Sequence, residues 1–235
     1  MKTIKTLALL MLSLNAAATV VRFETTIGNF DIELYEDDAP ITAQNFLNYV
    51  NDGDYDGTII HRSIPGFVVQ GGGFTYTGNG NFSLEPTHAT IVNEAGIPNQ
   101  RKTIGMARND DPNSATNQWF INLVNNPSLN PGGATNAGYA VFGEVINGFD
   151  VVELIASLQV VAYSAQLDGS PANFVNLPVH KFMGQTLAGT NPPQVSSNSS
   201  VDTNSVIRVN RAFVLADEFP ITEGLSGAWF NPETN

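Results

Sequence analysis

Short apolar runs, separated by turn residues, most constrain what this chain can fold into. Residues 20–35 alternate between apolar and polar side chains on both sides of Ile27-Gly28-Asn29, which predicts a β-hairpin with one buried face. Further strand-like runs follow at 59–73, 103–108, 118–124, 139–146 and 206–215. Many short strands without a βαβ rhythm predict a mainly β fold, a closed or nearly closed antiparallel barrel, because closure removes exposed sheet edges.

Two segments instead carry the periodicity of a helix. In "APITAQNFLNYVNDG", apolar residues recur at i, i+3, i+4 and i+7 from Ala43, with Pro40 near the start and Gly53 just past the end. A second apolar stripe occurs in "GFDVVELIASL", residues 148–158. The sequence therefore predicts two amphipathic helices beside the strands.

Composition excludes several classes of function. The chain has 235 residues and no Cys, which rules out disulfides, thiol catalysis and Cys-ligated zinc. Its formal net charge of −12 argues against nucleic acid and anionic membranes as partners. Only 14% of residues are charged, while Gly (21) and Pro (13) are plentiful, as suits a turn-rich β protein.

The N-terminus is typical of an export signal. Lys2 and Lys5 precede an apolar core from Leu7 to Leu14, and the small residues 16–18 follow. We expect a signal peptide over residues 1–18, cleaved near Ala18, and a mature protein that is periplasmic or secreted. The alternative is a buried N-terminal helix. The apolar core is too short for a permanent transmembrane anchor, and an exported enzyme should not depend on ATP.

The C-terminal third changes in character. Residues 159–205 include the polar stretch "GTNPPQVSSNSSVDTNS", which predicts an inserted loop before the last strand. We expect one domain over 19–216 and a tail over 217–235. The tail carries Trp229 and Phe230, which we expect to dock on the barrel because exposed terminal aromatics are unusual.

Two glycine-containing motifs have ordinary interpretations. "DGDYDG" at 52–57 imitates the first half of a calcium loop, but position 12 is Ser63 where an EF-hand needs Glu, so a helix-to-strand turn is favoured. The run 71–73 is Gly-Gly-Gly without a following Lys-Ser or Lys-Thr pair, which favours a bend at a close approach over a phosphate loop.

The histidines give no ligand pattern, since His61, His88 and His180 are widely spaced. By strand period, His61 should point to the face opposite Arg62, and we interpret it as structural and hydrogen-bonded rather than catalytic. For Arg62 taken alone, a surface salt bridge is favoured over a functional role.

Several motifs in order resemble the cyclophilins, a family of peptidyl-prolyl cis-trans isomerases. The hallmark stands here as "IHRSIPGFVVQGG" (60–72), and "GMARNDDPNSATNQWFIN" (105–122) resembles the bacterial version of the second block. "GYAVFGEVINGFDVV" (138–152) and the helix "APITAQNFLNYV" also match, so the resemblance covers roughly 20–158. It implies a closed eight-stranded antiparallel β-barrel capped by two α-helices, in an exported bacterial member.

The resemblance also implies site residues and roles. Arg62 would be the catalytic arginine, and Gln70 would bond the substrate backbone or orient Arg62. The remaining implied residues line the proline pocket, or the groove beside it, and are Phe67, Val68, Ala107, Arg108, Gln118, Phe120, Leu129 and Tyr139. Tyr139 stands where the family often has His. No cofactor or metal is implied.

Three departures from the family pattern affect the site. Val68 replaces a common Met, which keeps the pocket apolar but makes it smaller. Gly73 replaces a frequent Asp. Ser128 falls where many eukaryotic members carry a Trp that helps to bind cyclosporin, so we expect weak or no cyclosporin binding.

Prolyl isomerisation would explain why no nucleophile accompanies the arginine. Rotation breaks no covalent bond, but it removes amide resonance at a cost of about 18–20 kcal/mol. A guanidinium directed at the proline nitrogen would stabilise the twisted amide more than the planar one. The implied partners are proline-containing polypeptides, unfolded or newly exported, and the expected state is a monomer. The alternatives are a binding or chaperone module with little turnover, or a scaffold domain in a larger secreted protein.

Overall fold

The computed structural model describes residues 18–179, 186–187, 194–195 and 201–216. The predicted signal peptide and the tail with Trp229 and Phe230 therefore lie outside the described residues, apart from Ala18 at the boundary. Among the described segments, no helix combines the length and apolar character needed to cross a membrane.

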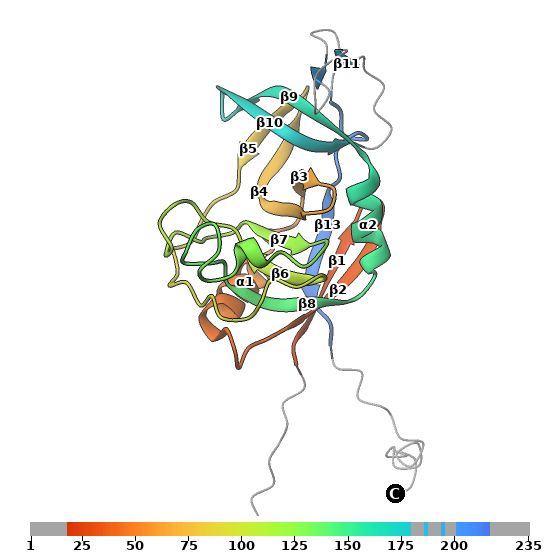
Figure 1. The fold of residues 1–235 in the computed structure, drawn as a ribbon. Coiled ribbons are helices and arrows are strands. Elements are labelled where there is room, and N and C mark those ends of the chain that lie inside the picture. The colour runs from red at the N-terminus through yellow and green to blue at the C-terminus, as the bar shows by residue number, and fades with distance from the viewer. Residues whose placement is uncertain (1–17, 180–185, 188–193, 196–200, 217–235) are drawn as a thin grey trace, which may run out of the picture.

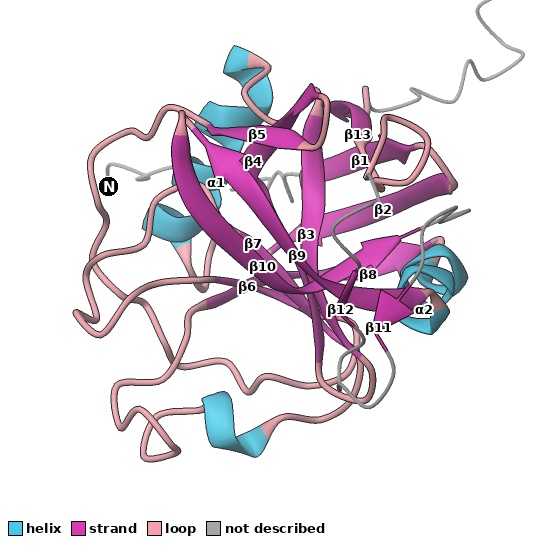
Figure 2. Cartoon of the chain, turned by 90° about the horizontal axis from the view of Figure 1, so that it is seen from above, coloured by secondary structure: helices cyan, strands magenta, loops and turns pink. Residues whose placement is uncertain are grey.

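Strands dominate the structure, with two α-helices at its sides (Figures 1 and 2). The N-terminal elements are β1 (Val20–Thr25), β2 (Gly28–Leu34), α1 (Pro40–Asp52), β3 (Thr58–Ile64), β4 (Val68–Gly78) and β5 (Asn81–Leu84). The central elements are β6 (Thr103–Met106), β7 (Trp119–Asn122), a 3₁₀ turn (Pro127–Leu129), β8 (Val141–Asn147) and α2 (Phe149–Ser157). The last are β9 (Gln159–Leu167), β10 (Ser170–Val179), β11 (Thr186–Leu187), β12 (Gln194–Val195) and β13 (Val209–Val214).

Both predicted helices form, and the first has the predicted boundaries. Helix α1 begins at Pro40 and ends before Gly53, whose left-handed backbone (φ 78°) lets its N–H bond the carbonyl of Val50. The segment "DGDYDG" then turns the chain from α1 into β3, as expected for a helix-to-strand turn.

The prediction of a closed barrel was wrong. The strand order β11-β12-β9-β5-β4-β7-β6-β8-β2-β1-β13 has two free ends, with β3 and β10 pairing off it to β4 and β9. Strand β3 meets the start of β13 without a continuous ladder. Ile59 forms an isolated bridge with Arg208, just before β13, and single backbone hydrogen bonds run from Ile60 N to the Ile207 carbonyl (2.9 Å) and from Gly57 N to the Val209 carbonyl (2.7 Å). The pairing of β3 with β4 is also irregular here, because Ile59 faces three residues of β4 and His61 is an extra residue of β3. Bulges of this kind bend a strand and interrupt continuous pairing.

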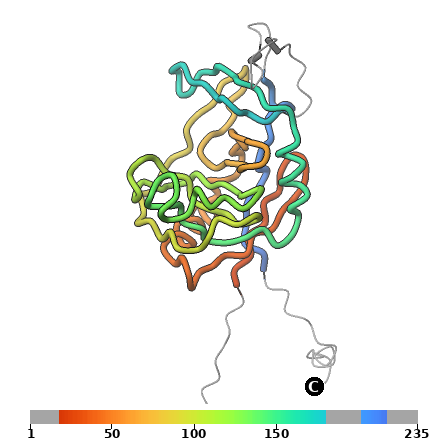
Figure 3. Tube along the Cα trace, viewed as in Figure 1, coloured from red at the N-terminus to blue at the C-terminus, as the bar shows by residue number. Residues whose placement is uncertain are grey.

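The buried side chains form two apolar clusters. The larger fills the interior between the sheet and the helices and includes Phe23, Phe46, Trp119 and Phe142. The smaller lies under β9 and β10 and includes Phe82, Tyr163 and Phe174, with Phe74 packed against it. Figure 3 traces the β9–β10 hairpin across the top of the molecule, above β3 and β4.

Segment 159–179 is therefore a hairpin and not part of a loop. Leu167 pairs with Ser170 across a two-residue turn, in which Asp168 (φ 49°) and Gly169 (φ 79°) both take positive φ. This backbone is the type I′ turn that joins twisted strands. The polar residues after Val179 lie largely outside the described part of the chain.

Candidate active site

A pocket of about 170 Å³ opens on the face formed by β3, β4, β7 and the segment before β8. Every site residue implied by the sequence, apart from Gln118, lines it: Arg62, Phe67, Val68, Gln70, Ala107, Arg108, Phe120, Leu129 and Tyr139. Gln118 lies beside it, in a neighbouring pocket of about 310 Å³ that Gln70, Ala107 and Arg108 also line. Residues spread over 78 positions of sequence thus converge on one site.

Arg62 is held by a chain of two amide side chains. Its Nη1 donates to Gln70 Oε1 at 3.2 Å, and Gln70 Nε2 donates to Gln118 Oε1 at 3.0 Å. Gln118 is placed against the backbone of Gly73, where a Cβ would come within 2.6 Å of the Gln118 side chain. The departure at Gly73 thus makes room for the last member of the chain.

The guanidinium of Arg62 is half-buried, and burial lowers its pKa. It still carries its charge at neutral pH, because an arginine guanidinium is not deprotonated in proteins. Within the described ranges, no carboxylate lies at salt-bridge distance from it. The surface salt bridge considered from the sequence is therefore not found there, and most of the guanidinium donors remain free for a ligand.

Aromatic side chains form the apolar part of the pocket. Phe120 is 5% exposed, and its ring meets that of Tyr139 edge to face at 5.7 Å. Gly105 in β6 lies directly behind Phe120, where an added Cβ would come within 2.7 Å of Phe120 Cζ. The pocket floor therefore depends on a glycine at that position.

Arg108 has a different role from Arg62. Its Nε and Nη2 donate to the carbonyl of Gly138, its Nη2 also to Thr135 Oγ1, and its guanidinium stacks on the Tyr139 ring at 4.5 Å. Since these donors are committed to the loop before β8, and Nη1 donates to the carbonyl of Asn109 at 2.8 Å, Arg108 shapes the pocket wall.

Three buried asparagines, which the sequence analysis missed, support the pocket from below. Asn126 donates to the carbonyl of Phe67 at 3.0 Å and to Asn122 Oδ1 at 2.7 Å. Asn122 donates to Asn99 Oδ1, and Asn99 donates to the carbonyls of Leu129 and Tyr139. The network thereby fixes the backbone of three pocket residues.

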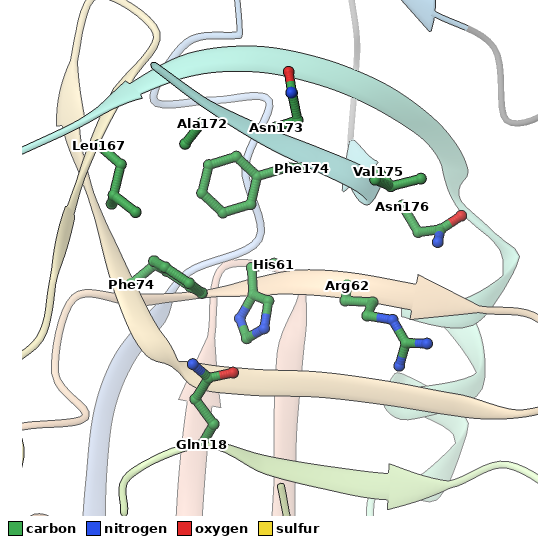
Figure 4. A pocket seen from close by; sticks show the side chains of 10 residues that line it. All are labelled: His61, Arg62, Phe74, Gln118, Leu167, Ala172, Asn173, Phe174, Val175 and Asn176. Carbon is green, nitrogen blue, oxygen red and sulfur yellow. The ribbon is translucent and has the colours of Figure 1, made fainter. Parts of the chain in front are cut away.

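His61 does not point away from Arg62 as strand alternation predicted. The pairs Ile60–Gly71 and Arg62–Gln70 leave His61 as an extra residue in a bulge, so both side chains line the same cavity (Figure 4). Burial and then the charge of Arg62 lower the pKa of His61 to about 3. His61 is a neutral buried side chain, although its Nδ1 has no hydrogen-bond partner among the described residues.

The model of the cyclophilin type peptidyl-prolyl cis-trans isomerase family matches residues 20–177. The chain belongs to this family. A peptidyl-prolyl cis-trans isomerase of Acinetobacter baylyi is 49% identical over 157 residues, covering 66% of this chain and 81% of that protein. Peptidyl-prolyl cis-trans isomerase B of Escherichia coli is 46% identical over 140 residues, covering 58% of this chain and 83% of that protein.

The solved structures support the cyclophilin fold alone. A cyclophilin type isomerase of Cryptosporidium parvum superposes with a TM-score of 0.55 at 21% identity, covering 86% of this chain and 99% of that one. The same protein was also crystallised in the presence of the dipeptide Ala-Pro (TM-score 0.53). The family and the reaction class predicted from the sequence are thus confirmed, as is the mainly β fold with two helices.

The cyclophilin match extends beyond the motifs that first suggested it. Those motifs ended near residue 158, whereas the family match continues through β9 and most of β10 to residue 177. The other two residues that depart from the family pattern are Val68, which is buried in the pocket wall, and Ser128, which is exposed on the 3₁₀ turn.

Proposed function

We propose that this cyclophilin rotates X-Pro peptide bonds with Arg62 as the catalytic residue. The observation that carries the proposal is a half-buried guanidinium, oriented by Gln70 and free of carboxylates in the described chain, on the rim of an apolar pocket. The proline ring of the substrate would lie against Phe120, with Val68 and Leu129 beside it.

In this mechanism Arg62 acts on the twisted amide. As the C–N bond rotates, resonance is lost and the proline nitrogen regains a basic lone pair. A guanidinium donor directed at that nitrogen binds the transition state more tightly than either planar isomer. Arginine suits this role because its charge persists and its donors are held in a rigid fork.

The size of the rate enhancement indicates how much the charge of Arg62 and the apolar pocket each contribute. A hydrogen bond to a charged group contributes about 1.5–3 kcal/mol, which corresponds to roughly 10- to 150-fold in rate. Any larger acceleration comes from the pocket, which holds the ring while the preceding carbonyl rotates and keeps water from the planar amide.

The direct test is a prolyl-peptide isomerisation assay on the protein and on Arg62→Ala. We expect kcat/KM to fall by more than tenfold with an unchanged circular dichroism spectrum. Arg101→Ala is the matched control, because Arg101 is a surface arginine paired with Glu153 and lies outside the pocket. A near-wild-type rate for Arg62→Ala would remove Arg62 from the mechanism.

The clients we propose are unfolded or newly exported proteins, and the protein itself is an exported bacterial cyclophilin. Residues 1–18 support this proposal, because basic residues are followed by an apolar stretch and then by small residues, as in an export signal. In a bacterial host, cell fractionation should find a shortened chain in the periplasm or medium. Substituting Leu9 and Leu10 with Arg should retain the full-length chain in the cytoplasm, and export of that variant would contradict the proposal.

We also propose weak cyclosporin binding, because Ser128 offers an exposed hydroxyl where many eukaryotic members present an indole. Inhibition of peptide isomerisation should require micromolar concentrations or more. Nanomolar inhibition would show that the indole is dispensable here.

A further inference from the structure

A second cavity, of about 330 Å³, adjoins the first pocket, and Arg62 lines both. Figure 4 shows the side chains that line this second cavity. One wall comes from the body of the fold, through His61, Arg62, Phe74 and Gln118. The other wall comes from the β9–β10 hairpin, through Leu167, Ala172, Asn173, Phe174, Val175 and Asn176. Its volume is at the lower end of the range for ligand sites, about 300–1,000 Å³.

The side chains that line this second cavity are mostly apolar, and amide side chains are the polar groups among them. Phe74, Phe174, Val175 and Leu167 supply the apolar surface, while Gln118, Asn173 and Asn176 supply amides that can bond a peptide backbone. Arg62 is the only charged side chain among the lining residues. This chemistry fits an apolar side chain on an extended peptide better than a charged one.

Bulges on both walls direct side chains at this cavity. On β3, the bulge described above places His61 and Arg62 together. On β10, Val175 and Asn176 lie between the pairs Phe174–Tyr163 and Leu177–Val161, so two residues face one residue of β9. Bulges re-aim side chains in this way, and they often lie beside active sites.

Aromatic packing holds the hairpin wall in place. Phe74 contacts the Phe174 ring at 5.2 Å and the His61 ring at 4.7 Å, both edge to face. Phe174 also packs on Phe82 at 4.5 Å within the smaller apolar cluster. Val175 remains 56% exposed, and an exposed valine above an apolar cavity is available to a ligand.

We propose that this cavity is a second substrate subsite, which takes an apolar side chain within a few residues of the isomerised proline. The inference rests on the proposed function, because its main argument is continuity with the proline pocket. Arg62 lines both, and Gln118 links the cavity to the Gln70–Arg62 chain. An extended peptide advances about 3.3–3.6 Å per residue, so a chain with its proline in the pocket crosses Arg62 and reaches the cavity with a nearby residue.

The test compares peptides in which a single residue differs. The parent is an Ala-Ala-Pro-Ala-Ala peptide, and each Ala in turn is replaced by Leu, Phe or Asn. A protease-free assay, such as exchange spectroscopy, keeps protease specificity out of the result. At one position we expect Leu or Phe to raise kcat/KM by roughly tenfold over Asn, the lower end of what a hydrophobic pocket discriminates.

Two variants then assign that preference to the cavity. Val175→Asp should reduce the apolar-to-Asn ratio towards one by placing a carboxylate at the apolar mouth, and Ala172→Leu should do so by filling the space. Val92→Asp is the matched control, because Val92 is 58% exposed and does not line the cavity. Melting temperatures identify any variant that has lost the hairpin.

The outcomes separate the inference from the function on which it rests. If no peptide is isomerised faster than in buffer, the proposed function fails. If all peptides are isomerised with the same kcat/KM, or if the preference survives both Val175→Asp and Ala172→Leu in folded protein, the subsite is contradicted and the isomerase remains.

Discussion

The proline pocket and the second cavity, called here the hairpin cavity because the β9–β10 hairpin forms one of its walls, share Arg62 but are built differently. The pocket lies over the large core, and asparagines that are 5% exposed or less fix the backbone of its residues. The cavity lies over the small cluster, and one of its walls is a single hairpin with an exposed valine. Under the two proposals above, the pocket carries the common chemistry and the hairpin selects among substrates.

The largest effect on kcat/KM is expected from a substitution that pushes the Phe120 ring into the pocket. Gly105→Ala places a methyl group within 2.7 Å of Phe120 Cζ and forces the ring into the space of the proline. Overpacking of this kind costs about 1–3 kcal/mol, and we expect kcat/KM to fall roughly tenfold or more. Gly96→Ala is the control, because a Cβ there meets only Glu94 O, at 4.0 Å. Unchanged kinetics for Gly105→Ala would mean that Phe120 does not contact substrate.

Removing the support of the pocket should have the next largest effect. Asn126→Ala deletes the donor to the Phe67 carbonyl and leaves Asn122 Oδ1 without that bond. An unsatisfied buried polar group costs about 1–3 kcal/mol. Chemical unfolding should report a loss of that size, accompanied by a rise in KM. Asn51→Ala, on the exposed face of α1, should change neither quantity; equal behaviour of the two variants would contradict a supporting network.

His61 should make stability depend on pH at the boundary between the two regions. Its pKa is about 3 in the folded protein, against about 6.5 when unfolded, so between these values the unfolded chain binds more protons. Stability is therefore lost as pH falls below about 6.5, by about 1.4 kcal/mol per pH unit. Urea unfolding at pH 7 and pH 5 should show a loss about 2 kcal/mol larger for wild type than for His61→Gln. Equal losses would show that His61 titrates normally.

The smallest effect on kcat/KM is expected at Val68, the residue of the pocket wall that departs from the family pattern. Val68→Met adds flexible apolar volume to a pocket of about 170 Å³, and methionine adapts to irregular spaces. We expect kcat/KM to change by less than about threefold, since adaptable hydrophobic replacements are tolerated. A change of more than tenfold on an Ala-Pro peptide would show that Val68 sets the pocket size tightly.

The sequence predicted those features that depend on a short stretch of neighbouring residues, such as helix ends and motif residues. Pro40 and Gly53 bounded α1 correctly because helix ends have strong residue preferences. The motif residues, Arg62 and Phe120 among them, converge as implied. The Asp168-Gly169 turn was also readable, because Asp-Gly between alternating apolar residues is a strong hairpin signal, but the polar stretch beyond it obscured that signal.

Other features depended on contacts between distant residues. Strand alternation failed at His61 because the bulge is set by pairing with β4 and not by the local sequence. Asn99, Asn122 and Asn126 show no periodicity, and only the fold reveals that they meet. His88 and Asp52, which lie 36 positions apart, come within 3.5 Å for the same reason.

The central claim is that Arg62 accelerates rotation of the bound prolyl bond and does more than hold the peptide. The most direct measurement is exchange spectroscopy of an Ala-Pro peptide bound at saturation, first to the wild-type protein and then to Arg62→Ala. The dissociation constant of the peptide is measured in parallel for both proteins. The account predicts that cis-trans exchange on the protein slows by more than tenfold, while the peptide affinity changes by less than about threefold. Unchanged exchange with weakened binding would contradict it and would favour a peptide-binding module instead.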